Sequence, residues 1–182
     1  TPNKVTSNSL MHLSVNVRSP RAKAIADWAH ALVNDQLDDA AKIISDYSEY
    51  PLFLTRSLDE ARAYLRDRLY SQDDLPDRRI GLLASSQARR LRPFGLEMSS
   101  TFQTGVDWPR WFVDEATDIR SSCVLEVAAS EFKCQGLEID WAGVCWGDDF
   151  FWDPSEETWR AKRLRGGSWV MDSDKTHAKN RY

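Results

Sequence analysis

The sequence predicts an α/β lobe in which helices pack on a mostly parallel sheet. Short apolar runs that suit strands alternate with stretches of helical periodicity along the first half of the chain. Residues 141–146 stay apolar at both parities, which is typical of a strand covered on both faces. A length of 182 residues allows one substantial core. We therefore expect a single domain, residues 1–182.

The first third of the chain alternates between the two kinds of pattern. Residues 10–17 suit a strand, and Ser19 can cap a helix over residues 20–34 whose first position is proline. Apolar residues at helical spacing predict a second helix over about 37–47. Residues 52–55 then suit a short strand.

The middle of the chain begins with a helix signal. The S-x-x-E pattern at residues 57–60 is a capping box, and the helix that it opens should run to about Tyr70. Residues 80–84 predict a buried strand. The serine pair at residues 85–86 is expected to cap a short arginine-rich helix, which the proline and glycine at residues 93–95 end.

The last third is expected to hold more strands than helices. A short helix over 108–116 precedes a strand over 123–128 and the strand over 141–146. Aromatic and β-forming residues on both sides of turn formers predict a β-hairpin insertion over 150–170. The polar residues 171–182 suggest a mobile tail.

Composition narrows the class of protein without naming a function. The net charge of −4 argues against a generally basic surface, although local arginine clusters could still contact phosphates. Three cysteines without a C-x-x-C pair, Cys123, Cys134 and Cys145, indicate reduced thiols and neither a disulfide framework nor a zinc site. No apolar run approaches the roughly 20 residues that span a bilayer. We expect a cytoplasmic protein with no metal ligands and no membrane partner.

Two motifs resemble those of superfamily-one DNA/RNA helicases. SEFKCQGLE, residues 130–138, resembles the pattern T-x-H-x-x-K-G-L-E, and LSVNVRSP, residues 13–20, is similar to L-x-x-N-x-R-S. In the first motif Gly136, Leu137 and Glu138 match, while Ser130, Phe132 and Gln135 replace Thr, His and Lys. EFKCQGLEIDW, together with RIGLLASSQARRLRPFG upstream, looks most like the Schlafen-group-3-like branch of these helicases.

This resemblance implies the C-terminal RecA-like (P-loop NTPase-type) lobe of an ATP-dependent helicase or translocase. Arg18 would be the arginine finger, and Gly136, Glu138 and Gln135 would lie at the nucleotide, with Glu138 on its sugar. A guanidinium can donate two parallel hydrogen bonds to phosphate oxygens. No G-x-x-x-x-G-K-[ST] loop occurs in the sequence, so ATP and Mg²⁺ would be held by a missing N-terminal lobe. We expect a three-layer lobe, truncated before its final motif and inactive alone.

Nucleic acid is the second expected partner, as single-stranded DNA or RNA. Free amides and arginines at the end of a strand favour phosphate binding. The candidate contacts are Ser85, Ser86, Arg89, Arg90 and Ser130. Asp148 and Asp149 follow a strand and are interpreted as solvated acids. Among the tryptophans, Trp28, Trp141 and Trp146 suit the core. The tryptophans that could be exposed are Trp108, Trp111, Trp152 and Trp159.

A non-catalytic module remains the main alternative. The same scaffold could use the hairpin at residues 152–169 as a protein-binding surface, because one fold supports many functions. A degenerate lobe that senses nucleic acid is a third possibility. A phosphate-binding loop in the coding sequence upstream of Thr1 would favour the helicase.

Overall fold

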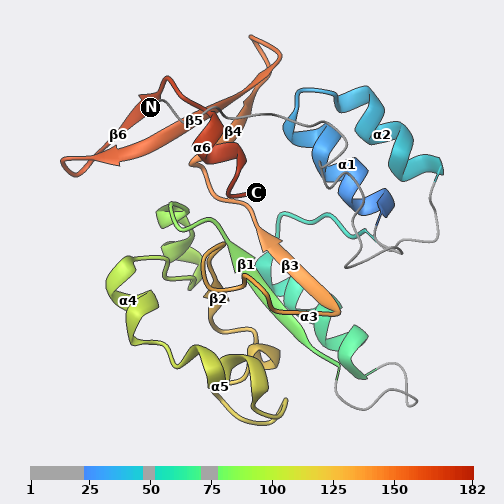
Figure 1. Cartoon of the computed structure of the whole chain (residues 1–182), viewed down its shortest axis with the longest axis vertical. Helices are drawn as coiled ribbons and strands as arrows, with labels where there is room; N and C mark the ends of the chain where they lie inside the picture. Colours follow the sequence, from blue (N-terminus) through green and yellow to red (C-terminus); the bar gives the residue numbers. More distant parts are fainter. Residues whose placement is uncertain (1–22, 47–51, 71–77) are drawn as a thin grey trace, which may run out of the picture. The chain divides into compact units, whose positions relative to one another are not determined.

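The computed structural model describes residues 23–46, 52–70 and 78–182 (Figure 1). The sequence predicts one lobe, and the chain divides into two compact units, residues 1–52 and 53–182. The predicted strand over residues 10–17 and the predicted arginine finger Arg18 lie outside the described residues.

The first unit contains two packed helices, α1 (Lys23–Val33) and α2 (Leu37–Asp46). Small side chains let the helices approach, since Ala31 and Ala40 are both buried. Asp35, at a φ of 64°, turns the chain between them in the left-handed conformation that often follows a helix. The two helices that were predicted from the apolar periodicity of the sequence are therefore confirmed.

A three-stranded parallel sheet, in the order β2–β1–β3, forms the centre of the second unit. The middle strand β1 (Ile80–Ala84) pairs with β2 (Ala128–Ala129) on one side and β3 (Trp141–Cys145) on the other. In β1, Ile80 and Leu82 are fully buried. The α/β class with a parallel sheet is therefore confirmed.

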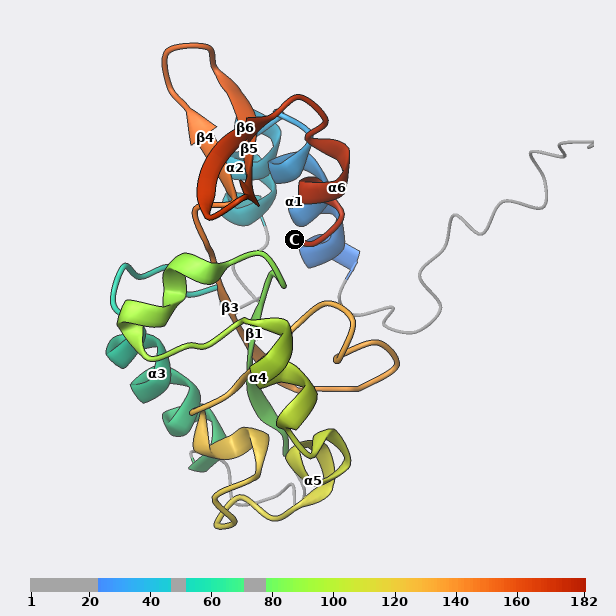
Figure 2. The same cartoon turned by 90° about the vertical axis from the view of Figure 1, so that its left-hand side faces the viewer.

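Helices cover the two faces of β1, as Figure 2 shows. Helix α3 (Leu58–Tyr70) lies on one side, and α4 (Ser100–Gly105) and α5 (Trp108–Val113) lie on the other. A Cβ at Gly143 would lie 3.0 Å from Leu65 of α3, and one at Gly81 would lie 3.2 Å from the Trp111 ring of α5. Glycines in β1 and β3 thus allow both helices to pack closely.

The start of α3 confirms half of the predicted capping box. The Ser57 hydroxyl accepts a hydrogen bond from the Glu60 amide at 3.3 Å. The Glu60 carboxylate does not return to the Ser57 amide, because it accepts a hydrogen bond from the Thr55 hydroxyl, which also accepts from the Ser57 amide. Residues 52–55 form no strand, and Phe53 instead stacks on Tyr64 of α3 with ring centroids 4.6 Å apart.

The prediction that β3 is covered on both faces is wrong. Side chains along β3 alternate between half-buried and exposed, and Val144 is 57% exposed. β3 is an edge strand of the sheet. The apolar residues at both parities therefore make both faces of β3 suitable for burial, but one face is left open to solvent.

Substitution of Val144 tests this open face. Val144→Lys should change the free energy of unfolding by less than about 1 kcal/mol, because the side chain stays in water. Leu83 is the matched control, since it is the register partner of Val144 on the central strand. Leu83→Lys should lose about 1–3 kcal/mol. Urea unfolding measures both, and equal losses would mean that Val144 is covered.

The predicted strand over residues 123–128 also differs from the structure. Residues 123–128 were expected to be one strand, but Ser122–Val124 form a 3-10 turn and only Ala128–Ala129 pair as β2. Leu125, at a φ of 64°, breaks the extended chain and inserts a fully buried side chain. Burial of Leu125 therefore outweighs the local preference of these residues for a strand.

The predicted hairpin over 150–170 is part of a three-stranded antiparallel sheet, in the order β4–β5–β6. β4 (Phe150–Asp153), β5 (Thr158–Arg165) and β6 (Ser168–Asp172) are joined by two turns, the second at Gly166 and Gly167 with positive φ. The short helix α6 (Thr176–Lys179) follows, where the sequence suggests a mobile tail. In this region Ala178 is buried and the Tyr182 ring stacks on Trp146, with centroids 4.1 Å apart.

Candidate functional site

Polar residues gather at the carboxyl ends of the parallel strands. Ser85 directly follows β1, Ser130 directly follows β2, and Asp149 comes shortly after β3. All three are almost fully buried, with exposed fractions of 1%, 3% and 0%. Because ligands of open α/β sheets bind at this edge, we take it as the candidate site.

Asp149 is the centre of a buried hydrogen-bond network. Its carboxylate accepts from the Ser85 hydroxyl at 2.7 Å, the Tyr182 phenol at 2.8 Å and the Arg181 guanidinium at 3.3 Å. Arg181 also donates to the Ser85 hydroxyl at 3.0 Å. Burial, together with the Asp149 charge, raises the pKa of Tyr182, so the phenol stays protonated and keeps donating.

The expectation that Asp148 and Asp149 are solvated acids is wrong for Asp149. A buried carboxylate needs an opposite charge and hydrogen-bond donors. Arg181 supplies the charge from a position 32 residues further along the chain. No local pattern around Asp149 could have indicated that partner.

Ser86 already binds an anionic group from within the chain. Its amide and its hydroxyl both donate to the Glu131 carboxylate, at 2.8 and 2.7 Å. These are the donors that the sequence assigns to a nucleic-acid phosphate. Glu131 follows Ser130 after β2, and no pattern in the sequence marks it as a site residue. A phosphate at Ser86 would therefore have to displace the Glu131 carboxylate.

The two candidate arginines lie at the start of a 3-10 helix, Arg89–Phe94. Ser85 and Ser86 do not cap it as predicted, because its N-cap residue is Ala88 and the Ser85 hydroxyl accepts from the Gln87 amide. Arg90 pairs with Asp148 at 2.7 Å. The buried Nε of Arg89 has no hydrogen-bond partner among the described residues. Because this nitrogen is buried, it does not itself face a ligand from solvent.

The predicted nucleotide contacts follow Ser130 closely in the sequence. Gln135, Gly136 and Glu138 are exposed in the loop that runs from the end of β2 back to the start of β3. Asp140, at the end of that loop, accepts from the Arg79 amide at 2.7 Å, ahead of β1. In the described part of the chain, no hydrogen bond or ion pair joins these three residues to the serines.

The residues of this loop suit a contact with a sugar, whereas Asp148 and Asp149 do not suit a metal site. Gly136 has a φ of 82°, and a Cβ built there would meet no atom within 4 Å. Glu138 is exposed, and its carboxylate makes no hydrogen bond or ion pair with any described residue. A free carboxylate can accept hydrogen bonds from ribose hydroxyls. Asp148 and Asp149 face Arg90, Lys162 and Arg181, so they do not fit as Mg²⁺ ligands.

Gly147 belongs to the site but was not among the residues predicted from the sequence. Its amide donates to the Tyr182 phenol at 2.8 Å. A Cβ at this position would lie 2.5 Å from the Ala88 Cβ and 2.9 Å from the Ala88 Cα. The glycine before the acid pair was the available signal, since a strand-end glycine can mark a close backbone approach.

We expect Gly147→Ala to destabilise the second unit by about 2–3 kcal/mol, because the methyl group meets backbone that cannot move aside easily. Gly105→Ala is the control, since a Cβ there meets no atom within 4 Å. It should be neutral or slightly stabilising. Thermal unfolding of the two variants compares them, and similar melting temperatures would contradict the close packing at Gly147.

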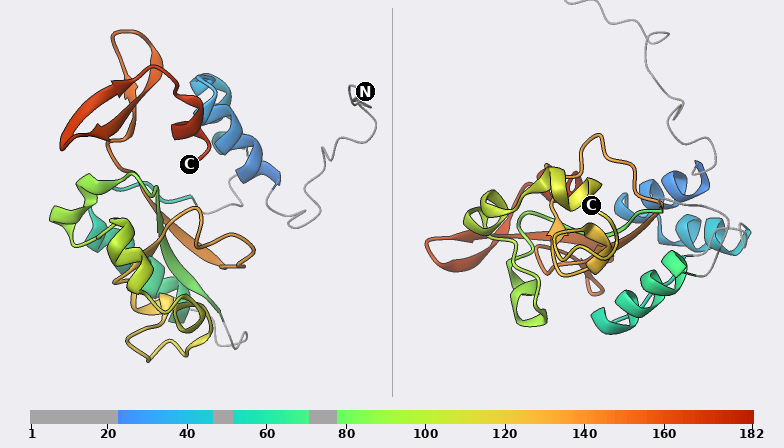
Figure 3. Two further views of the ribbon diagram at one scale, coloured as in Figure 1. Left: turned by 60° about the vertical axis from the view of Figure 1, so that its left-hand side comes forward. Right: turned by 90° about the horizontal axis from the view of Figure 1, so that it is seen from below.

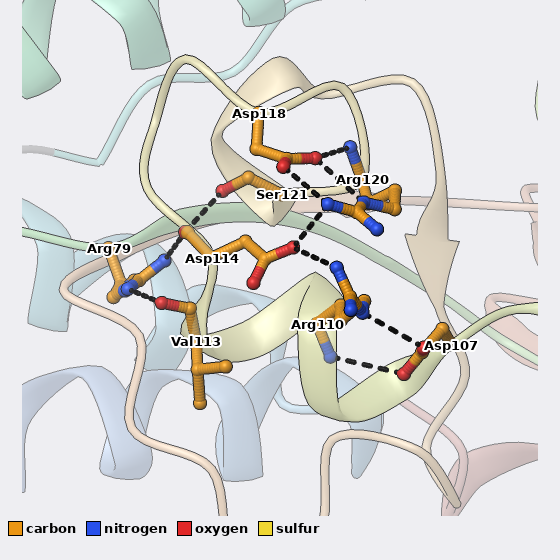
Figure 4. A network of polar contacts seen from close by, with 8 residues as sticks. All are labelled: Arg79, Asp107, Arg110, Val113, Asp114, Asp118, Arg120 and Ser121. Carbon is orange, nitrogen blue, oxygen red and sulfur yellow. Dashed lines mark hydrogen bonds and ion pairs between the residues drawn. The ribbon is translucent and has the colours of Figure 1, made fainter.

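A second polar network lies at the opposite, amino edge of the sheet (Figure 4). Arg79, directly before β1, donates to the carbonyls of Val113 and Asp114. Hydrogen bonds from Arg120 hold the pKa of Asp118 well below its usual range. Apart from Arg79, the charged side chains of this network pair with one another, so the network fixes the loop after α5.

Comparison with known proteins gives one finding. The family model described as Schlafen group 3, DNA/RNA helicase domain, matches residues 2–181. No curated protein and no solved structure gives a significant match. None of the helices in the described residues is long and apolar enough to cross a membrane.

Proposed function

This chain belongs to the Schlafen group 3 DNA/RNA helicase domain family, and we propose that it acts as the second lobe of an ATP-dependent helicase or translocase. The observation that supports this role is the buried polar edge of the parallel sheet. Ser85 and Ser130 end two neighbouring strands there, and the Ser86 donors bind an anionic group. Such an edge suits a lobe that holds a phosphate backbone while a cleft closes.

The nucleotide side of the proposal rests on the helicase-like motifs. Arg18 would reach the terminal phosphate of a nucleotide held by a partner lobe, and Glu138 would accept from its sugar. Gly136 leaves room for the ligand, and Gln135 adds a neutral amide where relatives carry a lysine. ATP with Mg²⁺ supplies the phosphoryl chemistry when bound to the partner lobe. The chain alone should not hydrolyse ATP.

The nucleic-acid side rests on donors at the serine edge. A backbone phosphate would take the place of the Glu131 carboxylate at Ser86, and the guanidinium of Arg89 would add charge. Arg90 would exchange Asp148 for a second phosphate. Each exchange replaces one anionic partner with another, so the donors are never left unpaired.

Substitutions at Ser86 and Glu131 test this competition. Ser86→Ala removes a donor and should weaken binding of a fluorescein-labelled single-stranded oligonucleotide by roughly tenfold. Glu131→Gln removes the internal anionic competitor and should strengthen binding, by about threefold or more. Fluorescence anisotropy at several salt concentrations measures both affinities.

Glu115→Gln is the matched control, because it removes the same charge from an exposed loop residue after α5. It should leave the affinity close to that of the parent chain. If Glu131→Gln binds no more tightly than Glu115→Gln, the serine edge does not hold the phosphate. If the parent chain binds no single strand at low salt, the nucleic-acid role is wrong as a whole.

A further inference from the structure

The antiparallel sheet has one buried face and one face with no assigned role. Residues paired across antiparallel strands point to the same side. Phe150, Trp159 and Ala161 share the buried face. The other face carries Phe151, Lys162, Met171, Leu164 and Trp169, according to the register of the three strands. We call these five residues the outer face.

Two positive charges lie over aromatic rings on the outer face. The Lys162 ammonium is 4.2 Å from the centroid of Phe151, and the Arg90 guanidinium is 5.5 Å from that of Trp169. Asp148 pairs with both, at 3.3 Å to Lys162 and 2.7 Å to Arg90. One carboxylate thus holds two cations beside two rings, and all four groups are at least partly exposed.

The hairpin of β5 and β6 is strongly basic within an acidic chain. Residues 158–171 contain four basic residues, Arg160, Lys162, Arg163 and Arg165, and no acidic one, whereas the chain as a whole carries a net charge of −4. Arg163 is 54% exposed and lies 3.9 Å from Asp172. Arg165 pairs with Ser168 through the backbone, but its side chain is exposed and makes no hydrogen bond or ion pair with any described residue.

Beyond Ala161, the β5–β6 hairpin pairs with no third strand among the described residues, so both of its edges are free. The last residue of β5 that pairs with β4 is Ala161, so Arg163 and Arg165 lie beside a free strand edge. Both views of Figure 3 show β5 and β6 ending in a free tip. Arg163 and Arg165 share the side of Ala161, opposite the outer face, so their long side chains would reach round this edge to contact a ligand there.

We propose that the outer face and the hairpin arginines bind single-stranded nucleic acid. A base would stack on Trp169, and Arg163 and Arg165 would contact the flanking phosphates. Stacking suits any base, and the cations suit the backbone, so binding would be largely independent of sequence. A duplex would bind less well, because its bases are already stacked on one another. This inference deepens the proposed function and rests on it.

The charge of the hairpin favours a polyanion over a protein partner. Leu164 and Met171 are 43% and 44% exposed, which by itself would suit a protein surface. Of the four cations in this acid-free run, Arg160 pairs with Asp153 and Glu156 and Lys162 pairs with Asp148. The exposed Arg163 and Arg165 are the cations that suit phosphate contacts. A second copy of the chain and an unrelated protein are therefore alternatives for the experiment to exclude.

The test uses the whole 182-residue chain and a fluorescein-labelled single-stranded 20-mer of mixed sequence. Trp169→Leu should weaken binding by about 5- to 150-fold, the range expected for one stacked base. Arg165→Gln should reduce the slope of log affinity against log salt concentration by about 0.7, the contribution of one phosphate contact on a single strand. The corresponding duplex should bind more weakly than the single strand.

Two exposed residues elsewhere in the second unit provide controls. Tyr70→Leu removes an aromatic ring that is 70% exposed at the end of α3, and Arg56→Gln removes an exposed arginine before α3. Both should bind as the parent chain does. Melting temperatures of all four variants show that each one is folded, and Arg165→Gln touches no internal contact.

The outcomes separate this inference from the proposed function. If Ser86→Ala weakens binding but Trp169→Leu and Arg165→Gln match their controls, the hairpin is not part of the track and the inference is wrong. If the parent chain binds no oligonucleotide, both proposals fail. If sedimentation shows that Trp169→Leu abolishes self-association instead of oligonucleotide binding, the outer face is an interface between copies and the inference is also wrong.

Discussion

Replacing Asp149 with alanine should destabilise the second unit by about 3–5 kcal/mol, the usual cost of removing one partner of a buried ion pair. Asp149 is fully buried, and Arg181, its cationic partner, is 17% exposed. Without the carboxylate, the guanidinium would remain largely desolvated with no opposite charge, and the Ser85 hydroxyl and Tyr182 phenol would lose their acceptor. Urea unfolding followed by tryptophan fluorescence measures the loss.

The neighbouring acid is the natural control for this variant. Asp148 is paired with Arg90 and Lys162, but its side chain is 35% exposed. Asp148→Ala should therefore lose no more than about 1 kcal/mol, as surface ion pairs do. The double variant Asp149→Ala with Arg181→Met should recover part of the loss, because no charge is then left buried. A loss at Asp149 as small as that at Asp148 would show that the network is solvated.

The Asp149 network joins the two sheets of the second unit, which links it to the proposed function. Ser85 follows the central parallel strand, whereas Arg181 and Tyr182 follow the antiparallel sheet and α6. All three donate to one carboxylate. Asp149 therefore holds the segment that contains Ser86 in place relative to the β5–β6 hairpin. A nucleic-acid track that uses both would depend on this connection.

Local patterns in the sequence predicted the elements that depend on local interactions. Helix α3 follows a capping serine, and β1 is an apolar run between polar segments, so neither needs distant residues to be identified. The same holds for Gly95, which ends the arginine-rich segment at a φ of 89°. These features are fixed within a few residues of chain.

Features that depend on distant residues could not be predicted. Trp111 and Trp159 were candidates for exposure, yet they are 1% and 8% exposed, and Trp146, assigned to the core, is 37% exposed. Trp111 is buried against Gly81, thirty positions earlier in the chain. The position of a tryptophan in the sequence does not reveal which glycine leaves room for its ring.

The features of the candidate site likewise divide into those that local patterns predict and those that depend on distant residues. The placement of Ser85 and Ser86 directly after β1 follows from the strand pattern, but the occupation of the Ser86 donors by Glu131 does not, because that residue is 45 positions away. The loop of Gly136 and Glu138 was identified only through the helicase-like motif. Their roles at a nucleotide stay predictions.

Substitution of Arg18 should have the largest effect on activity. If, as proposed, this domain works with a lobe that carries a phosphate-binding loop, Arg18→Ala should lower the rate of ATP hydrolysis by the pair by roughly 10³- to 10⁵-fold, the contribution of an arginine finger. In the proposed role, the guanidinium would stabilise charge that develops on the phosphoryl group in the transition state. The loss should therefore appear mainly in kcat, with little change in KM.

Two controls separate this role from simple loss of charge. Arg18→Lys keeps the charge but not the planar pair of donors, so it should remain strongly impaired. Arg21→Ala removes a nearby arginine outside the helicase-like motif and should leave the rate almost unchanged. If Arg18→Ala hydrolyses ATP at the rate of Arg21→Ala, or if the isolated chain turns over ATP without Arg18, then the lobe does not complete an ATP cleft, and the family motif has been retained for another purpose.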